Sequence, residues 1–193
     1  MEPIEYLAKI EPIVVSLFQA FIHAERRSAD EYRVHAPRQE FYNYKLSQKS
    51  AQNDDRIDKQ HEDYCANANE SKEVLLLIDT ATAAAAGAIL QIAQQCIALT
   101  WPDGQRLDKG RPVGSQHLSS VIWNGRNQAM HFEDGEAKKQ TKNCLDILYK
   151  DFSLDISDLA SRPRSLAKDI IGLLGWHSYE IFANDMNEML KCK

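Results

Sequence analysis

The stretch EVLLLIDTATAAAAGAILQIAQQCIALTW, residues 73–101, decides the fold because it is the longest apolar segment of the chain. Its length and its alanine-rich centre favour one long helix. Asp79 and the glutamines Gln91, Gln94 and Gln95 interrupt the apolar run, which disfavours a membrane span. We therefore predict a central helix that is buried on most sides and that neighbouring helices approach closely.

Helical periodicity recurs on both sides of this stretch. Apolar residues repeat at helical spacing from Pro3 to about His23, and again in 118–123, 141–152 and 166–190. Neither a β-alternating run nor a glycine-rich phosphate loop accompanies them. The sequence thus predicts an all-α bundle of about five main helices, folded as a single domain over residues 1–193.

A charged insert, residues 24–72, follows the first predicted helix. Pro37 should interrupt any continuous helix in 25–49, so we expect two shorter helical pieces there. Residues 51–72 are almost devoid of large apolar side chains, which predicts a polar loop or a solvated helix. The aromatic and basic residues of 32–49 could stack nucleic-acid bases, but plain packing is the simpler interpretation.

Composition and charge are those of a soluble globular protein. A net charge of -5 argues against holding nucleic acid by bulk electrostatics, so any RNA contact needs a local basic cluster or a cleft. The four cysteines lack C-x-x-C spacing, which predicts reduced structural thiols. The acidic start of the chain is unlike a secretory leader, and we expect a cytoplasmic protein.

The most concentrated chemistry lies in Arg126-Asn127-Gln128-Ala129-Met130-His131. A guanidinium can bind a phosphate through two parallel hydrogen bonds, and an imidazole can accept and donate a proton near neutral pH. Other Arg and His pairs share the loose spacing, but Arg126 is singled out by the polar residue directly after it. For Asn, Asp or His directly after the Arg and a His at the fixed spacing of five positions, residue frequencies predict only about 0.05 chance matches.

Helical geometry separates the two groups. On an ideal helix that begins at Leu118, Arg126 and His131 point about 140° apart and cannot touch within one chain. Trp123 and Met130 lie between them and could contact a second copy across a two-fold axis, so that two arginines and two histidines converge on one cleft. The same wheel predicts a core-facing stripe: Leu118, Val121, Ile122, Gly125 and Ala129.

The segment Trp123–Phe132 resembles the signature of the HEPN superfamily, small all-α domains with an Arg, a following polar residue and a His a few positions on. This resemblance implies a helical bundle that forms a homodimer. In many members it also implies metal-independent endoribonuclease activity, often in toxin–antitoxin or antiphage systems. The matching residues here are Arg126, Asn127 and His131. The chain departs from a minimal domain in its size, through the insert and the C-terminal helix.

Metal-independent RNA cleavage fits these residue types. His131 would move protons at the ribose 2′-hydroxyl and the leaving 5′-oxygen, and Arg126 would neutralise charge on the phosphate. Asn127 could position His131 or a phosphate oxygen. Three lysines could guide the RNA backbone toward the cleft, or simply begin a solvated helix: Lys138, Lys139 and Lys142.

Other interpretations remain open at this stage. The chain could be a non-catalytic RNA- or nucleotide-binding module, or a structural dimerisation domain in which Arg126 is a surface donor and His131 a helix C-terminal cap. The histidines lack metal-ligand spacing, so we expect no metal and no cofactor. The expected partners are RNA, a second copy and, in a toxin–antitoxin setting, an antitoxin or other inhibitory protein, with no membrane.

Overall fold

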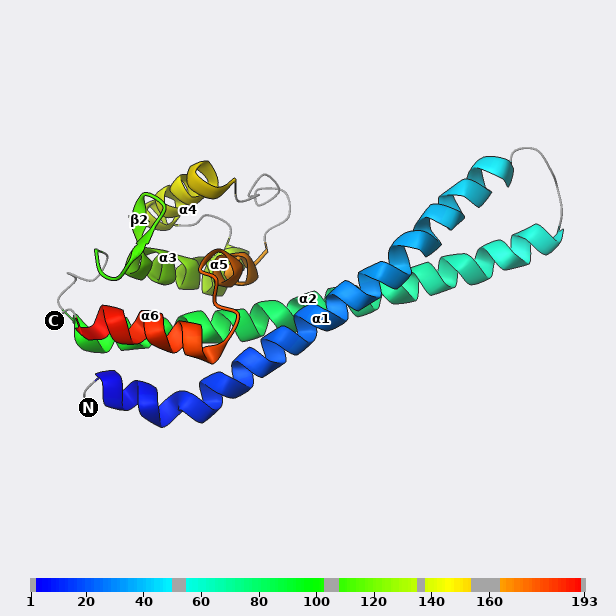
Figure 1. Cartoon of the computed structure of the whole chain (residues 1–193). Helices are drawn as coiled ribbons and strands as arrows, with labels where there is room; N and C mark the ends of the chain where they lie inside the picture. The colour runs from blue at the N-terminus through cyan, green and yellow to red at the C-terminus, as the bar shows by residue number, and fades with distance from the viewer. Residues whose placement is uncertain (1–2, 50–54, 103–107, 135–137, 154–163, 192–193) are drawn as a thin grey trace. The chain divides into compact units, whose positions relative to one another are not determined.

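The computed structural model describes residues 3–49, 55–102, 108–134, 138–153 and 164–191 (Figure 1). These residues confirm an all-α fold. Its α-helices are α1 Pro3–Lys49, α2 Asp55–Thr100, α3 Leu118–His131, α4 Lys139–Phe152, α5 Ala167–Leu173 and α6 Tyr179–Lys191. Strands β1 (Pro112–Val113) and β2 (Gln116–His117) form a small antiparallel hairpin before α3, and a short 3-10 turn, η1 (Phe132–Asp134), follows α3.

The chain divides into two compact units. Unit 1 comprises Met1–Phe21 and Ala83–Lys193, so it takes the start of α1, the C-terminal part of α2 and every later element. Unit 2 comprises Ile22–Thr82, the remaining parts of α1 and α2, which form a helical hairpin (Figure 1). The residues singled out in the sequence, 123–142, all belong to unit 1.

The charged segment 24–72 is helical over its described residues. Helix α1 continues through Pro37 to Lys49, so the prediction of two shorter pieces is wrong. Proline removes one backbone hydrogen bond and crowds the carbonyl four residues earlier. Pro37 is exposed, so water can solvate the carbonyl that loses its partner. Residues 55–72 belong to α2, which agrees with a solvated helix and not with a loop, while 51–54 lie outside the described residues.

Among its described residues, unit 2 buries few apolar side chains. Its buried positions on α2 follow the 4-3-4 spacing of a two-helix seam: Ser71, Leu75, Ile78 and Thr82. Ser28 is buried on the α1 side, whereas Leu76 and Leu77 are 68% and 70% exposed. Small polar side chains thus occupy much of the described seam.

Two helical segments, Ile4–Phe41 and Cys65–Thr100, are long and apolar enough to cross a membrane by length and composition. Core helices of soluble proteins pass the same test. The C-terminal part of α2 is such a core helix in unit 1, since its inward-facing residues are fully buried: Ala86, Ile89, Leu90, Ala93, Cys96 and Ile97. The prediction of a buried central helix is confirmed for this part of α2.

The C-terminal periodic run, 166–190, folds as two helices because the chain turns between α5 and α6. Gly175 adopts a φ of 71°, which glycine reaches without the strain that a Cβ would cause. The turn directs Trp176 into the core of unit 1, where its ring meets Phe182 edge-on at 4.9 Å. Phe182 also lies 5.7 Å from Phe18 of α1, so this aromatic cluster joins both ends of the chain.

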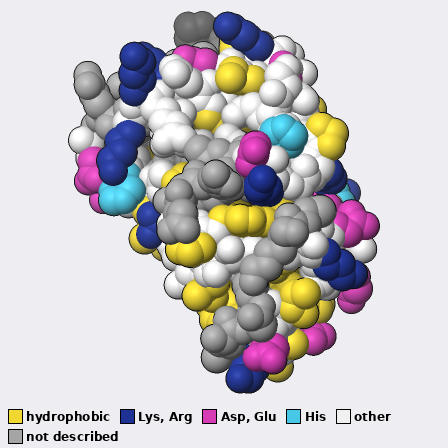
Figure 2. Space-filling model, turned by 90° about the vertical axis from the view of Figure 1, so that its left-hand side faces the viewer, with side chains coloured by type: hydrophobic (Ala, Val, Ile, Leu, Met, Phe, Trp, Pro, Cys, Tyr) yellow, Lys and Arg dark blue, Asp and Glu magenta, His cyan; other side chains and the backbone are white. Residues whose placement is uncertain are grey.

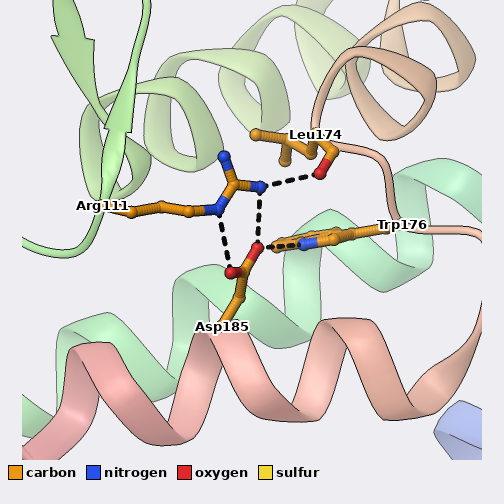
Figure 3. A network of polar contacts seen from close by, with 4 residues as sticks. All are labelled: Arg111, Leu174, Trp176 and Asp185. Carbon is orange, nitrogen blue, oxygen red and sulfur yellow. Dashed lines mark hydrogen bonds and ion pairs between the residues drawn. The ribbon is translucent and has the colours of Figure 1, made fainter.

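An ion pair between exposed Arg111 and buried Asp185 links the segment before β1 to α6 (Figure 3). Arg111 donates from Nε to Asp185 Oδ1 and from Nη2 to Oδ2, both at 2.9 Å. Its Nη2 also donates to the Leu174 carbonyl at 2.7 Å, and Trp176 Nε1 donates to Asp185 Oδ2 at 2.8 Å. The Asp185 side chain is 8% exposed. One carboxylate therefore holds three segments of unit 1 together.

Asp185→Ala should destabilise the protein by about 3 kcal/mol, because it leaves the Arg111 guanidinium and the Trp176 N–H without their buried acceptor. Asp169→Ala is the matched control, since it breaks a more exposed ion pair with Arg164 and should cost no more than about 1 kcal/mol. Urea unfolding followed by circular dichroism measures both. Equal losses would contradict the structural role of Asp185.

Candidate functional site

Helix α3 carries the candidate residues, and its inward face fixes how they point. Leu118, Val121 and Ile122 are fully buried, and Gly125 is buried too, which confirms most of the predicted core stripe. A Cβ at position 125 would lie 2.7 Å from Ile170 Cδ1 of α5. Glycine therefore permits a closer approach of α3 and α5 than any larger residue would allow.

Two buried amides outside the predicted stripe also hold α3. Gln128 donates from Nε2 to the Arg164 carbonyl and accepts from the Leu166 N–H at Oε1, both at 2.7 Å. Asn124 accepts a hydrogen bond from Thr141 Oγ1 of α4 at 3.2 Å. Buried polar groups are costly without partners, so these pairings favour one rotation of α3 about its axis. The directions of Arg126 and His131 follow from that rotation.

Arg126 is half-buried and turned toward α2. Its Nε donates to Gln91 Oε1 at 2.5 Å, and its Nη1 donates to Asn127 Oδ1 at 3.3 Å. A guanidinium has five N–H donors. Within the described part of the chain these two contacts leave three donors for a ligand. The guanidinium is thus held through Nε and Nη1, while Nη2 keeps its donors for a phosphate.

His131 is exposed at the last position of α3. The negative end of a helix dipole is a favourable place for a basic side chain. Its Nδ1 lies 2.8 Å from Oδ2 of Asp134 in η1. The two side chains are 57% and 68% exposed, respectively. The imidazole is therefore oriented by a carboxylate and remains open to solvent.

The structure does not bring Arg126 and His131 together within one chain. Arg126 contacts Gln91 of α2, whereas His131 contacts Asp134 of η1, as the 140° separation on the helical wheel leads one to expect. Asn127 contacts Arg126, so of the predicted motif these two residues form one contact and His131 stands apart.

The remaining predicted positions are at the surface. Met130 is 55% exposed and Trp123 is half-buried on the same side of α3. Three lysines are exposed where α4 begins: Lys138, Lys139 and Lys142. Cations at a helix N-terminus oppose the helix dipole, so they strengthen the positive potential there at some cost to the helix. Figure 2 shows basic, acidic and apolar side chains interspersed on the face that it displays.

Cys96 and Cys144 of unit 1 are buried and structural. Burial raises the pKa of the Cys96 thiol to about 12, and burial also raises the pKa of Cys144. Both thiols stay protonated near neutral pH and are poor nucleophiles. Cys65, Cys96 and Cys144 form no disulfide, which confirms the prediction for them, and Cys192 lies outside the described residues.

No group of three or more His, Cys, Asp or Glu among the described residues is arranged to hold a metal ion.

Comparisons with protein-family models, with curated proteins and with solved structures found no match for this chain.

Two residues of the site were missed in the sequence. Gln91 entered only as an interruption of the apolar stretch, and no local pattern links it to Arg126, 35 positions later. Asp134 could have been found, because it lies three positions after His131, a spacing that places side chains on the same face of a helical turn.

Gln91→Met should free the Arg126 side chain while preserving the fold, because methionine matches the length of glutamine but offers no comparable acceptor. We expect the Arg126 Nε–H to lose its protection from solvent exchange in NMR spectra. Asn127→Ala is the control, since it removes only the Nη1 contact and should leave Nε–H protected. Unchanged protection in Gln91→Met would contradict the contact between α2 and α3.

Proposed function

We propose that this protein is a metal-independent endoribonuclease of the HEPN type, which acts as a homodimer and cuts RNA through attack of the ribose 2′-hydroxyl. One observation carries the proposal. The helix that presents a tethered guanidinium at Arg126 ends in an exposed imidazole, His131, which is oriented by the carboxylate of Asp134. A phosphate-binding group and a proton-transfer group thus occupy one rigid element.

The geometry of α3 suits a symmetric pair. Arg126 and His131 are five residues apart, or about 7.5 Å along the helix axis. If two copies of α3 run antiparallel about a two-fold axis level with the midpoint of this segment, Arg126 of one copy stands level with His131 of the other. The side of α3 that bears Trp123 and Met130 would face the axis, and its partly exposed apolar groups would supply the contact.

In the proposed reaction His131 Nε2 accepts the proton of the 2′-hydroxyl, and the 2′-oxygen forms a bond to phosphorus. The bond from phosphorus to the 5′-oxygen breaks, and an imidazolium returns a proton to that oxygen. Arg126 donates hydrogen bonds to the phosphate oxygens as negative charge develops on them. The products are a 2′,3′-cyclic phosphate and a free 5′-hydroxyl.

The biological setting belongs to the proposal as well. Cytoplasmic location is supported by burial of the C-terminal part of α2 within unit 1. A role in a toxin–antitoxin or antiphage system, and restraint by an antitoxin or other inhibitory protein, follow from the resemblance of the Trp123–Phe132 segment.

Purified protein should cleave RNA in EDTA, and Arg126→Ala and His131→Ala should each reduce cleavage by at least about a hundredfold, because proton transfer and charge neutralisation are each worth that much. Gel analysis and mass spectrometry of the 2′,3′-cyclic phosphate measure the reaction. His177→Ala is the control, since it removes an exposed imidazole from the loop before α6. If the unmodified protein binds RNA without cleaving it, a non-catalytic binding module is supported instead. If it neither binds nor cleaves RNA, a structural domain is supported.

The exposed lysines of α4 should contribute to RNA affinity. On a His131→Ala background, which prevents cleavage, Lys138→Ala and Lys142→Ala should each make the negative slope of log K against log salt shallower by about one, as expected for loss of one phosphate contact. Lys150→Ala, an exposed lysine at the other end of α4, should leave the slope unchanged. Fluorescence anisotropy with labelled RNA measures the slopes, and equal slopes in all variants would exclude the lysines from the RNA contact.

A further inference from the structure

The pair His131–Asp134 has a geometry that stability alone does not explain. Both side chains are more than half exposed. Exposed ion pairs contribute less than about 1 kcal/mol to folding. A carboxylate beside an RNA-binding surface also repels phosphate. Its presence within hydrogen-bond distance of the candidate base therefore points to an effect on the imidazole itself.

We propose that Asp134 is a positioning residue that holds His131 in the tautomer and orientation required for proton transfer. This inference rests on the proposed function.

The 2.8 Å contact sets which nitrogen carries the proton. An ionised carboxylate can only accept a hydrogen bond, so the neutral ring donates through Nδ1–H. The lone pair is then on Nε2, on the opposite side of the ring, where it can accept the proton of the 2′-hydroxyl. When Nε2 takes up that proton, the carboxylate stabilises the resulting imidazolium.

The local backbone accounts for the contact without help from distant elements. Helix α3 passes directly into η1, and Phe132 keeps helical dihedral angles, φ −64° and ψ −24°. Side chains three residues apart lie nearly above one another in a 3-10 turn. Asp134 is thus delivered to His131 by the same turn that ends the helix.

NMR of the imidazole nitrogens tests the contact without any need for activity. In the unmodified protein at a pH where His131 is neutral, we expect the proton on Nδ1. Asp134→Ala should shift the equilibrium toward the Nε2–H tautomer. Glu133→Ala is the matched control, since it removes an exposed carboxylate from the same turn and should leave the tautomer unchanged. The same tautomer in unmodified protein and Asp134→Ala would overturn the inference.

Steady-state kinetics test whether Asp134 contributes to RNA cleavage. Asp134→Ala should lower kcat for RNA cleavage by about ten- to a hundredfold, a part of what general acid–base catalysis contributes. Its KM should stay the same or fall, since one negative charge near the phosphate is lost. Asp134→Asn keeps an acceptor for Nδ1–H and should recover part of kcat. Glu133→Ala should change KM alone.

The outcomes separate this inference from the proposed function. Cleavage by the unmodified protein with an unchanged kcat in Asp134→Ala overturns the positioning role alone. An equal loss of kcat in Glu133→Ala does the same, because loss of charge would then suffice. No cleavage by the unmodified protein overturns the proposed function and this inference with it, whereas the NMR result would still report whether Asp134 sets the tautomer.

Discussion

The contact between α3 and α5 is the constraint on which the candidate site depends. The two helices approach closely because position 125 has no side chain in the path of Ile170. The Gln128 amide adds a donor and an acceptor to the backbone that leads into α5. Both contacts specify the rotation of α3 as well as its position. Since Arg126 and His131 are on the same helix, that rotation turns one toward α2 and the other toward η1.

The helical class and part of the core could be predicted, because both follow from periodicity within one segment. Leu118, Val121 and Ile122 repeat at helical spacing, and they are buried. Pro37 misled the prediction because the cost of proline depends on whether its surroundings can solvate the freed carbonyl. The Arg111–Asp185 pair joins positions 74 residues apart, and no local sequence pattern predicts such a contact. A polar residue such as Gln128 is expected to face solvent. Only the tertiary structure shows that backbone groups of Arg164 and Leu166 pair with its buried amide.

The candidate site likewise has one part that the sequence could predict and one part that it could not. The spacing of Arg126, Asn127 and His131 was enough to predict that the guanidinium and the imidazole would not meet in one chain. Their actual partners differ in kind. Asp134 is local and is delivered by the turn after α3, whereas Gln91 comes from another helix and depends on tertiary packing. The guanidinium is half-buried with unused donors, and the imidazole is exposed and oriented; the proposed homodimer would combine the two across a two-fold axis.

Mixing two inactive variants tests that combination most directly. Arg126→Ala and His131→Ala protein, co-refolded so that subunits exchange, should form mixed dimers in which one intact Arg126 meets one intact His131 across the two-fold axis. Half of the dimers would be mixed, and each would keep one of its two Arg126–His131 pairs, so with activity proportional to intact pairs the mixture should recover about one quarter of the unmodified activity. A mixture as inactive as its components, under conditions where the unmodified protein cleaves RNA and subunit exchange is verified, would contradict a site shared between two copies.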